Sequence, residues 1–267
     1  MLKKEFKTKI LMIAIIALFT LSVISANRMN LIVTNSNSGD KKICWGIKRT
    51  NNHEQPDFGS ENKKILDENE GICIGNDKEK HIYLTFDSGY EAGYIDKILD
   101  VLKENNIRAT FFITAHYLNT ASDKVEKMIE EKHIIGNHTC NHYSLPTISN
   151  DEIEKEIMKL HQSVYSKFGY EMKFIRPPKG EFCERTLKKI QSLGYKTVMW
   201  SFAYVDWNEK KQPSKEEAIK IITNNFHSGE IMLLHSNSKT NSEVLDTIIK
   251  EAQAQGYEFK GLDEFQK

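Results

Sequence analysis

The chain has 267 residues, and its 37 Lys and Arg side chains are balanced by 37 Asp and Glu side chains, so the formal net charge is zero. This length allows one large domain or two small ones. No Lys- and Arg-rich patch is interleaved with aromatic residues, which argues against nucleic acid as a partner. Charged runs such as DEIEKEIMK, residues 151–159, are typical of solvated helix faces.

The first 26 residues differ from the rest of the chain. A basic stretch, MLKKEFKTK, precedes 17 residues without a charge, ILMIAIIALFTLSVISA. This pattern is typical of a targeting segment. The apolar run is long for a cleaved signal peptide and short for a spanning helix, and Ser25 and Ala26 match a cleavage site only loosely. We therefore interpret residues 1–26 as a signal peptide or a membrane anchor, and the rest of the chain as exported.

Residues 27–80 are rich in Asn, Lys, Asp and Glu and are weakly periodic. They predict an extended lead-in packed on the following domain, with local anchors at ICWGIKR and GICIG. The four cysteines are too few for a disulfide framework in a chain of this size. One bridge between Cys44 and Cys73 is compatible with the sequence, and so are reduced thiols at all positions, which are Cys44, Cys73, Cys140 and Cys183.

From residue 81 onward, short β-rich runs alternate with amphipathic segments. The runs span residues 82–87, 109–114, 133–138, 173–178, 196–202, 230–235 and 257–260. Between them, apolar residues recur with helical spacing, as at Ile95, Ile98 and Leu102. Two helix starts have the form of a capping box, SNDE at 149–152 and SKEE at 214–217. The alternation predicts parallel strands joined by crossover helices, in a barrel or in an open doubly wound sheet.

Chemically active residues lie at or just after the ends of six successive runs. In chain order they are Asp87, His116, His138, Arg176, Asp206 with Trp207, and His235. Because the carboxyl ends of parallel strands meet at one rim, these side chains are predicted to converge. A single His or Asp at a strand end is most simply a structural or turn residue. Six such positions at one rim indicate a catalytic site.

His138 and His142 form an H-x-x-x-H pair. On a helical turn, side chains four residues apart point the same way, so the pair predicts two ligands for one metal ion. This spacing is common by chance, but its position directly after a strand strengthens the prediction. Cys140 would point away from that face, and we interpret it as a small buried residue.

Five motifs, TFDSGYE, NHTCNH, RPPKG, VDW and LLH, occur in the order and approximate spacing found in the polysaccharide deacetylases of carbohydrate esterase family 4. The chain resembles that family from about residue 80 to the C-terminus. The resemblance implies an α/β catalytic domain at residues 81–267, a distorted (β/α) barrel with about seven parallel strands. It also implies removal of acetyl groups from N-acetylated sugars with one divalent metal. Zinc is the first expectation, with cobalt or manganese as alternatives.

The resemblance implies a role for each motif residue. The catalytic set would be Asp87, Arg176, Asp206 and His235. Asp87 would act as the general base, oriented by Arg176, and His235 would act as the general acid. Asp206 would hold His235 protonated and correctly turned, since a neighbouring carboxylate raises the pKa of an imidazole. The metal ligands would be His138, His142 and Ser88.

The same resemblance implies a set of substrate-binding residues, Trp207, Leu233, Lys179 and Gly180. Trp207 and Leu233 would line a small apolar pocket for the acetyl methyl group. Lys179 would contribute its backbone N–H to the oxyanion, in the turn that it forms with Gly180.

Two positions depart from the family pattern. Most members have a second Asp, a charged third ligand, where this chain has Ser88, so we expect looser metal binding here. Lys179 stands where an aromatic residue is common. A cation there is suited to the lactyl carboxylate that distinguishes muramic acid from glucosamine. The alternative interpretation is a solvated loop lysine.

A narrower resemblance is carried by CWGIKRTNNHEQPD, TFDSGYEAGY and SFAYVDWN, which look like the delta-lactam-biosynthetic branch. That branch removes the acetyl group of N-acetylmuramic acid in peptidoglycan, leading to the muramic δ-lactam of the spore cortex. The implied partner is a peptidoglycan glycan strand. The implied form of the protein is a monomer that contacts a membrane only through its N-terminal segment. The implied location is the cell wall or forespore envelope, in a secreted or anchored form.

Three rival functions are compatible with parts of the sequence. The first is a deacetylase of peptidoglycan N-acetylglucosamine or of chitooligosaccharides. The second is a non-catalytic wall-binding relative, which Ser88 favours and the intact acid and base residues oppose. The third is a zinc peptidase, which would need a Glu after the first His of the pair, where this chain has Thr139.

Overall fold

The computed structural model describes residues 40–50 and 52–267. Residues 1–26, interpreted above as a signal peptide or anchor, lie outside this range. Among the described residues, no helix is both long enough and apolar enough to cross a bilayer. The chain divides into two units, residues 1–41 and 42–267. The fold and the site described below belong to the second unit.

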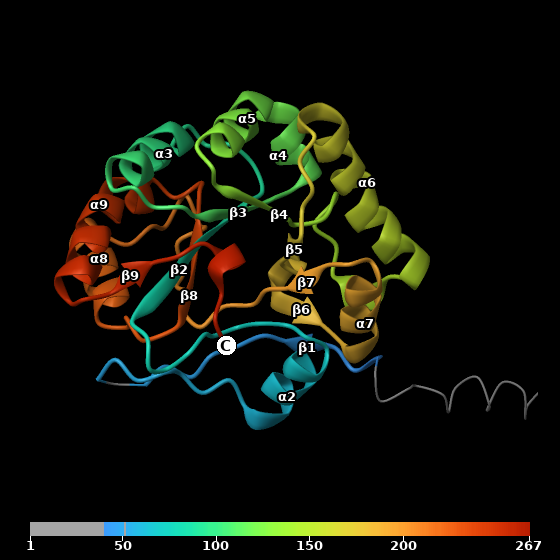
Figure 1. Cartoon of the computed structure of the whole chain (residues 1–267), viewed down its shortest axis with the longest axis horizontal. Helices are drawn as coiled ribbons and strands as arrows, with labels where there is room; N and C mark the ends of the chain where they lie inside the picture. The colour runs from blue at the N-terminus through green and yellow to red at the C-terminus, as the bar shows by residue number, and fades with distance from the viewer. Residues whose placement is uncertain (1–39, 51) are drawn as a thin grey trace, which may run out of the picture. The chain divides into compact units, whose positions relative to one another are not determined.

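A seven-stranded sheet organises this unit (Figure 1). Its strands are β2 (His81–Ser88), β3 (Thr110–Ile113), β4 (Ile134–Asn137), β5 (Phe174–Ile175), β7 (Lys196–Thr197), β8 (Glu230–His235) and β9 (Glu258–Phe259). The order is β7-β5-β4-β3-β2-β8, with β9 also paired to β2, and every pair is parallel. Each of the seven predicted runs thus contains a strand, and the predicted parallel pairing is confirmed.

The sheet curls into a distorted barrel. Phe202, which follows β7 in the chain, forms a parallel bridge with Met232 of β8. The backbone N–H of Leu233 then donates to the carbonyl oxygen of Phe202 at 2.9 Å. In the strand order, β7 and β8 are the two edges of the sheet. The contacts of Phe202 connect these two edges, so the sheet closes on itself. The predicted distorted barrel is confirmed, and the open doubly wound alternative is wrong.

Helices cover the outside of the sheet (Figure 1). They are α3 (Ile95–Glu104), α4 (Ala115–Thr120), α5 (Ser122–Glu130), α6 (Asn150–Phe168), α7 (Glu184–Ser192), α8 (Lys215–Thr223) and α9 (Lys239–Ala254). Both predicted capping boxes are present, with Ser149 starting α6 and Ser214 starting α8. All residues of β2 after His81 are buried. A strand covered on both faces in this way is mostly apolar along its length. The charged residue of β2, Asp87, lies near its carboxyl end, next to Ser88.

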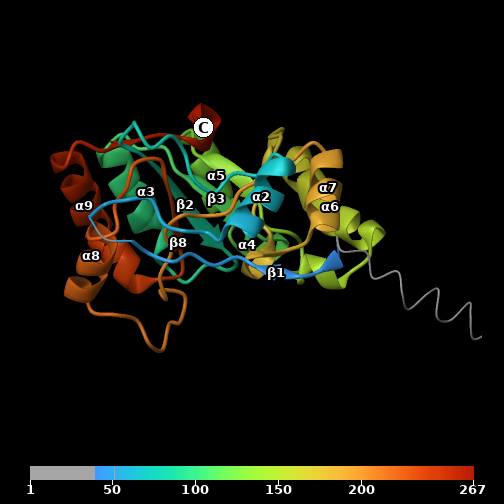
Figure 2. The same ribbon diagram turned by 90° about the horizontal axis from the view of Figure 1, so that it is seen from below.

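The part of the lead-in that belongs to the second unit and is described, residues 42–50 and 52–80, runs along the side of the sheet, drawn in blue and cyan in Figure 2. Its strand β1 (Ile43–Cys44) pairs antiparallel with β6 (Glu181–Phe182). Contrary to the extended structure expected from the sequence, it also contains a helix, α2 (Ser60–Glu68). Only Leu66 of this helix is buried, so its apolar periodicity is too weak to predict. All four cysteines are free thiols.

Candidate active site

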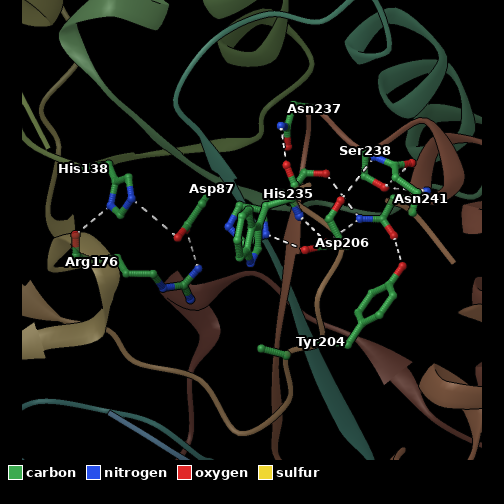
Figure 3. Close-up of polar contacts among 12 residues, drawn as sticks. Asp87, His138, Arg176, Tyr204, Asp206, His235, Asn237, Ser238 and Asn241 are labelled. Carbon is green, nitrogen blue, oxygen red and sulfur yellow. Dashed lines mark hydrogen bonds and ion pairs between the residues drawn. The ribbon is translucent and has the colours of Figure 1, made fainter. Parts of the chain in front are cut away.

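The carboxyl ends of the strands bring the predicted catalytic residues together (Figure 3). Asp87 in β2 and His235 in β8 are paired positions of adjacent parallel strands. His138 directly follows β4 and Arg176 directly follows β5. His116, which follows β3, is instead exposed on α4. The strand β3 therefore contributes no predicted residue to this cluster.

The carboxylate of Asp87 is held by a rigid cation. Arg176 is fully buried, and its Nη1 donates to Asp87 Oδ1 at 2.8 Å. Its Nη2 donates to Thr85 Oγ1 at 2.9 Å, and the guanidinium carbon lies 4.3 Å from the centre of the Phe112 ring. Charge-assisted hydrogen bonds of this kind fix both partners, so Asp87 has one defined orientation.

Asp87 is ionised at neutral pH. Burial alone would raise its pKa, but the Arg176 guanidinium and the imidazoles of His138 and His235 outweigh burial and hold the pKa below its ordinary value of 3.8. Its second oxygen, Oδ2, lies 3.5 Å from His138 Nε2. A carboxylate that is charged and partly free to accept a proton is suited to general base catalysis.

The imidazoles of His138 and His142 face one another, with ring centres 4.8 Å apart. Burial is the largest cause that lowers the pKa of both rings, and the pKa of His142 falls to about 4. Both rings are therefore neutral at pH 7, as metal ligation requires. His138 Nδ1 donates to the carbonyl oxygen of Arg176 at 2.8 Å, which leaves Nε2 with its lone pair free.

The helical turn predicted for this pair is wrong. The segment from His138 to the end of the motif is a loop, in which Thr139 and His142 have left-handed φ values of 66° and 57°. The N–H of Thr139 donates to Asn137 Oδ1 at 2.8 Å, and the N–H of His142 donates to Thr139 Oγ1 at 3.1 Å. These side-chain bonds take the place of helical bonds and still turn both rings inward.

The predicted third ligand, Ser88, is fully buried at the end of β2. Its hydroxyl oxygen accepts a hydrogen bond from Ser236 Oγ at 2.9 Å. Within residues 40–50 and 52–267, no three His, Cys, Asp or Glu side chains are grouped closely enough to hold a metal ion. The neutral pair of His138 and His142 fits a borderline divalent cation such as zinc. The remaining ligands would then have to be neutral oxygens.

His235 is paired with a buried carboxylate. Its Nδ1 donates to Asp206 Oδ1 at 2.7 Å and its backbone N–H donates to Asp206 Oδ2 at 2.8 Å. Burial alone would lower the pKa of His235, but Asp206 and then Asp87 outweigh burial and raise the pKa above 6.5. Because Nδ1 is taken by Asp206, Nε2 is the nitrogen available to a substrate, and it carries a proton in the charged form.

Lys179 and Gly180 lie in a turn that follows β5, and both residues have left-handed φ values, 60° and 65°. A Cβ at Gly180 would come within 2.5 Å of the Trp200 ring, so glycine is required there. Lys179 is exposed, and its charge adds to the burial that lowers the pKa of His142. The charge of Lys179 thus acts on one of the expected metal ligands, His142.

The predicted acetyl pocket is only partly formed by the protein. Leu233 is 4% exposed, but the Trp207 side chain is 55% exposed. The carbonyl oxygen of Trp207 accepts from Asn237 Nδ2 at 3.2 Å, which ties its loop to the segment after β8. A bound sugar would have to cover the indole before it could form an apolar wall.

Several residues of the site were missed by the sequence analysis. Thr85, within β2, accepts a hydrogen bond from Arg176. Asn241 donates to the Asp206 carboxylate, and Tyr204 donates to the Asn241 amide. Thr85 lies in the motif TFDSGYE and Tyr204 in the stretch SFAYVDWN, but neither was assigned a role, and Asn241 lies outside the quoted motifs.

A model of the polysaccharide deacetylase family matches residues 74–198. Over 226 residues the chain is 42% identical to the peptidoglycan-N-acetylmuramic acid deacetylase PdaA of Bacillus subtilis, a match that covers 84% of this chain and 86% of that protein. The chain belongs to the polysaccharide deacetylase family. The chain is also 34% identical to a peptidoglycan-N-acetylglucosamine deacetylase of Bacillus cereus, over 68% of this chain and 66% of that protein.

The solved structures agree with this membership. The fold of the deacetylase is similar to that of Bacillus subtilis PdaA, a family 4 carbohydrate esterase, with a TM-score of 0.83 and 41% identity over 85% of this chain and 97% of that chain. A family 4 carbohydrate esterase of Bacillus anthracis is similar with a TM-score of 0.72 and 38% identity, over 85% of this chain and 96% of that chain. Deacetylases of this family depend on a metal.

Proposed function

We propose that the deacetylase removes the acetyl group from N-acetylmuramic acid in peptidoglycan. The observation that carries the chemistry is the pair of Asp87 and His235 on adjacent strands, with pKa values shifted in opposite directions. One group is charged and accepts a proton, and the other is charged and donates one. The muramic substrate is supported by the name of the 42% identical relative.

The proposed reaction uses both halves of the site. Asp87 takes a proton from the water that attacks the acetyl carbon, and Arg176 keeps its carboxylate aimed during that transfer. His235 then gives the proton on Nε2 to the departing sugar nitrogen, while Asp206 stabilises the imidazolium. A divalent metal held by His138 and His142, zinc in our proposal and cobalt or manganese as alternatives, supplies polarisation of the acetyl carbonyl.

Lys179 is proposed to select muramic acid. Lys179 is exposed and its charge acts on His142, so the lactyl carboxylate of muramic acid would be attracted to it, and a glucosamine residue would offer no such group. Gly180 keeps the turn open, and the backbone N–H of Lys179 is proposed to bind the oxyanion. Trp207 and Leu233 are proposed to enclose the acetyl methyl group.

The freed amine of muramic acid is proposed to close on its own lactyl carboxyl group, forming the C–N bond of the δ-lactam of spore cortex while the carboxyl C–O bond breaks and water leaves. Such a substrate places the protein outside the cytoplasm, with residues 1–26 as its signal or anchor and residues 27–80 as the lead-in to the catalytic domain at 81–267. We propose that it acts as a monomer on the glycan strand.

The test is mass spectrometry of peptide-free glycan after incubation with the zinc-loaded full chain, beside an Asp87→Asn control. We expect loss of one acetyl mass from muramic acid residues, absent in the control. Loss from glucosamine residues alone would replace the proposed substrate with that of the 34% identical relative. No loss with zinc, cobalt or manganese would reject the enzyme and favour a wall-binding role.

A further inference from the structure

We propose that Asn241 is a positioning residue for the acid half of the site, and that the Tyr204 hydroxyl holds the other end of its amide. The inference rests on the proposed function, in which His235 is the general acid. Neither residue lies in one of the five family motifs. Figure 3 shows both residues to the right of Asp206, on the side away from the His235 ring.

Asn241 binds both partners of that pair. Its Nδ2 donates to Asp206 Oδ2 at 2.6 Å and to the carbonyl oxygen of His235 at 3.3 Å. Asp206 Oδ2 also accepts from the backbone N–H of His235, while Oδ1 accepts from His235 Nδ1. Three hydrogen bonds therefore fix the plane of one carboxylate, and removal of Asn241 would leave both remaining bonds to His235 itself.

The orientation of the amide follows from the chemistry of its neighbours. The carbonyl oxygen of His235 can only accept a hydrogen bond, so the Asn241 atom that faces it is the nitrogen. The opposite atom, Oδ1, accepts from the hydroxyl of Tyr204. Burial, with a smaller contribution from Asp206, raises the pKa of Tyr204, so the hydroxyl keeps its proton. The two acceptors, Asp206 and the His235 carbonyl oxygen, thus determine which way the amide faces, and Tyr204 holds its other end in that orientation.

The position of Asn241 in α9 makes a helix-forming role a poor explanation. Ser238 caps this helix and accepts from the N–H of Asn241 at 3.1 Å. Asn241 is 1% exposed in the first turn, where an apolar residue would bury surface at no polar cost. Its amide is satisfied by the catalytic pair and by Tyr204, so its polarity serves the site that the β8–α9 connection brings against it.

A misoriented imidazole delivers its proton poorly but does not weaken substrate binding. We therefore expect the change to fall on kcat and to spare KM. It should also depend on the leaving group. An amide nitrogen must be protonated to leave, whereas the 4-nitrophenolate of an acetyl ester leaves without a proton.

The test uses the zinc-loaded full chain with Asn241→Leu and Tyr204→Phe. A matched control is Ser242→Ala, at the next position of α9, where a buried hydroxyl donates only within its own helix to Lys239. For Asn241→Leu we expect kcat on the muramic amide to fall about 30-fold, with KM and zinc content kept and 4-nitrophenyl acetate hydrolysis within about threefold. Tyr204→Phe should show a smaller loss of the same kind.

A second readout does not depend on turnover. The ¹⁵N shifts of the His235 ring report which nitrogen carries the proton. We expect a single Nδ1–H form in the neutral ring of the wild type and a mixture in Asn241→Leu. Equal losses on amide and ester, or an unchanged kcat and ring spectrum, would overturn the inference. If the wild type released no acetate from any sugar amide, the proposed function would fail instead, and the ring spectra would still decide the role of Asn241.

Discussion

Asp87 and His235 are neighbours in the sheet, yet their environments shift their pKa values apart. Burial opposes the charged form of each, and a different partner overcomes it in each case, Arg176 for the carboxylate and Asp206 for the imidazole. The separation of two pKa values is what assigns base and acid in many hydrolases. At the residue scale, these two partner choices determine the chemistry of the site.

The activity of the deacetylase should therefore depend on pH with a known sign. His235 must be protonated, so kcat falls as pH rises through its raised pKa, on the alkaline side of 6.5. Asp87 must be ionised, so its own protonation lowers kcat only below pH 3.8. His142 gains a proton at about pH 4, which also lowers activity on the acid side. Asp206→Asn should move the alkaline limb to lower pH. A pH profile of acetate release with an unmoved alkaline limb would contradict this assignment.

Ser88 leaves the metal site without a third charged ligand. Ser88→Asp adds a carboxylate at the end of β2, and an opposite charge near the two imidazoles should strengthen zinc binding by at least about tenfold. Competition with a chromophoric chelator measures this change. Ser236→Ala is the control, because it removes the hydrogen-bond partner of Ser88 without adding charge. Equal affinities for wild type and Ser88→Asp would show that this position does not face the metal.

Lys179 offers a direct test of substrate selection. Lys179→Tyr removes this cation, and we expect the preference for muramic acid over glucosamine to fall by about two- to fivefold, the worth of one exposed charge contact. The ratio of kcat/KM on the two sugars is the measurement. An exposed lysine elsewhere, Lys132, provides Lys132→Tyr as a control. A preference that survives in Lys179→Tyr would make this residue a solvated loop lysine.

At the scale of elements, the loop with the two histidines depends on α6. Glu156 of this helix accepts from the N–H of Asn141 at 2.7 Å and from its Nδ2 at 2.5 Å. The loop is thereby anchored one residue before His142. Side-chain bonds and left-handed residues therefore determine its shape, which is why spacing alone predicted a helical turn that does not exist.

The start of α6 can be tested for its contribution to stability. The Ser149 side chain accepts from the N–H of Glu152 at 3.3 Å, and the Ser149 N–H donates to the Glu152 carboxylate at 2.9 Å. Ser149→Ala should lower the free energy of unfolding by about 1 kcal/mol, as measured in urea. Ser163→Ala, on the exposed middle of the same helix, should change it by less than about 0.5 kcal/mol. Equal losses would argue against the cap.

Elements with strong periodicity could be predicted from the sequence, and weaker ones could not. The strands β2 and β8 and the helix α3 carry long apolar patterns, and their boundaries match within about two residues. The two-residue strands β1 and β6, and the helix α2, were missed. The two strands are held by pairing with each other from segments far apart in the chain, and such contacts leave no local pattern. The helix α2 buries only Leu66 and so has no apolar face to recognise.

At the scale of the whole described unit, parallel topology explains why the site could be predicted. Residues from β2, β4, β5 and β8 meet because all four strands run in one direction. What could not be predicted is the support behind them. Thr85 and Tyr204 stand two residues before Asp87 and Asp206 and Asn241 lies in α9, but their hydrogen bonds to Arg176, Asn241 and Asp206 appear only in the structure.

The lead-in also contributes to the site from a distance. The backbone N–H of Trp45 donates to the carbonyl oxygen of Gly180 at 2.8 Å, and its indole donates to the carbonyl oxygen of Trp200 at 2.9 Å. The turn that presents Lys179 is therefore braced by a segment that precedes the barrel by about forty residues.

The most direct test of the proposed function is acetate release from two matched oligosaccharides, one with N-acetylmuramic acid and one with N-acetylglucosamine only. The zinc-loaded full chain is compared with Asp87→Asn and His235→Ala. We predict a higher kcat/KM on the muramic substrate and a loss of at least about a hundredfold in each variant. Equal or better hydrolysis of the glucosamine substrate, or variants as active as the wild type, would contradict the proposed substrate or the proposed acid and base.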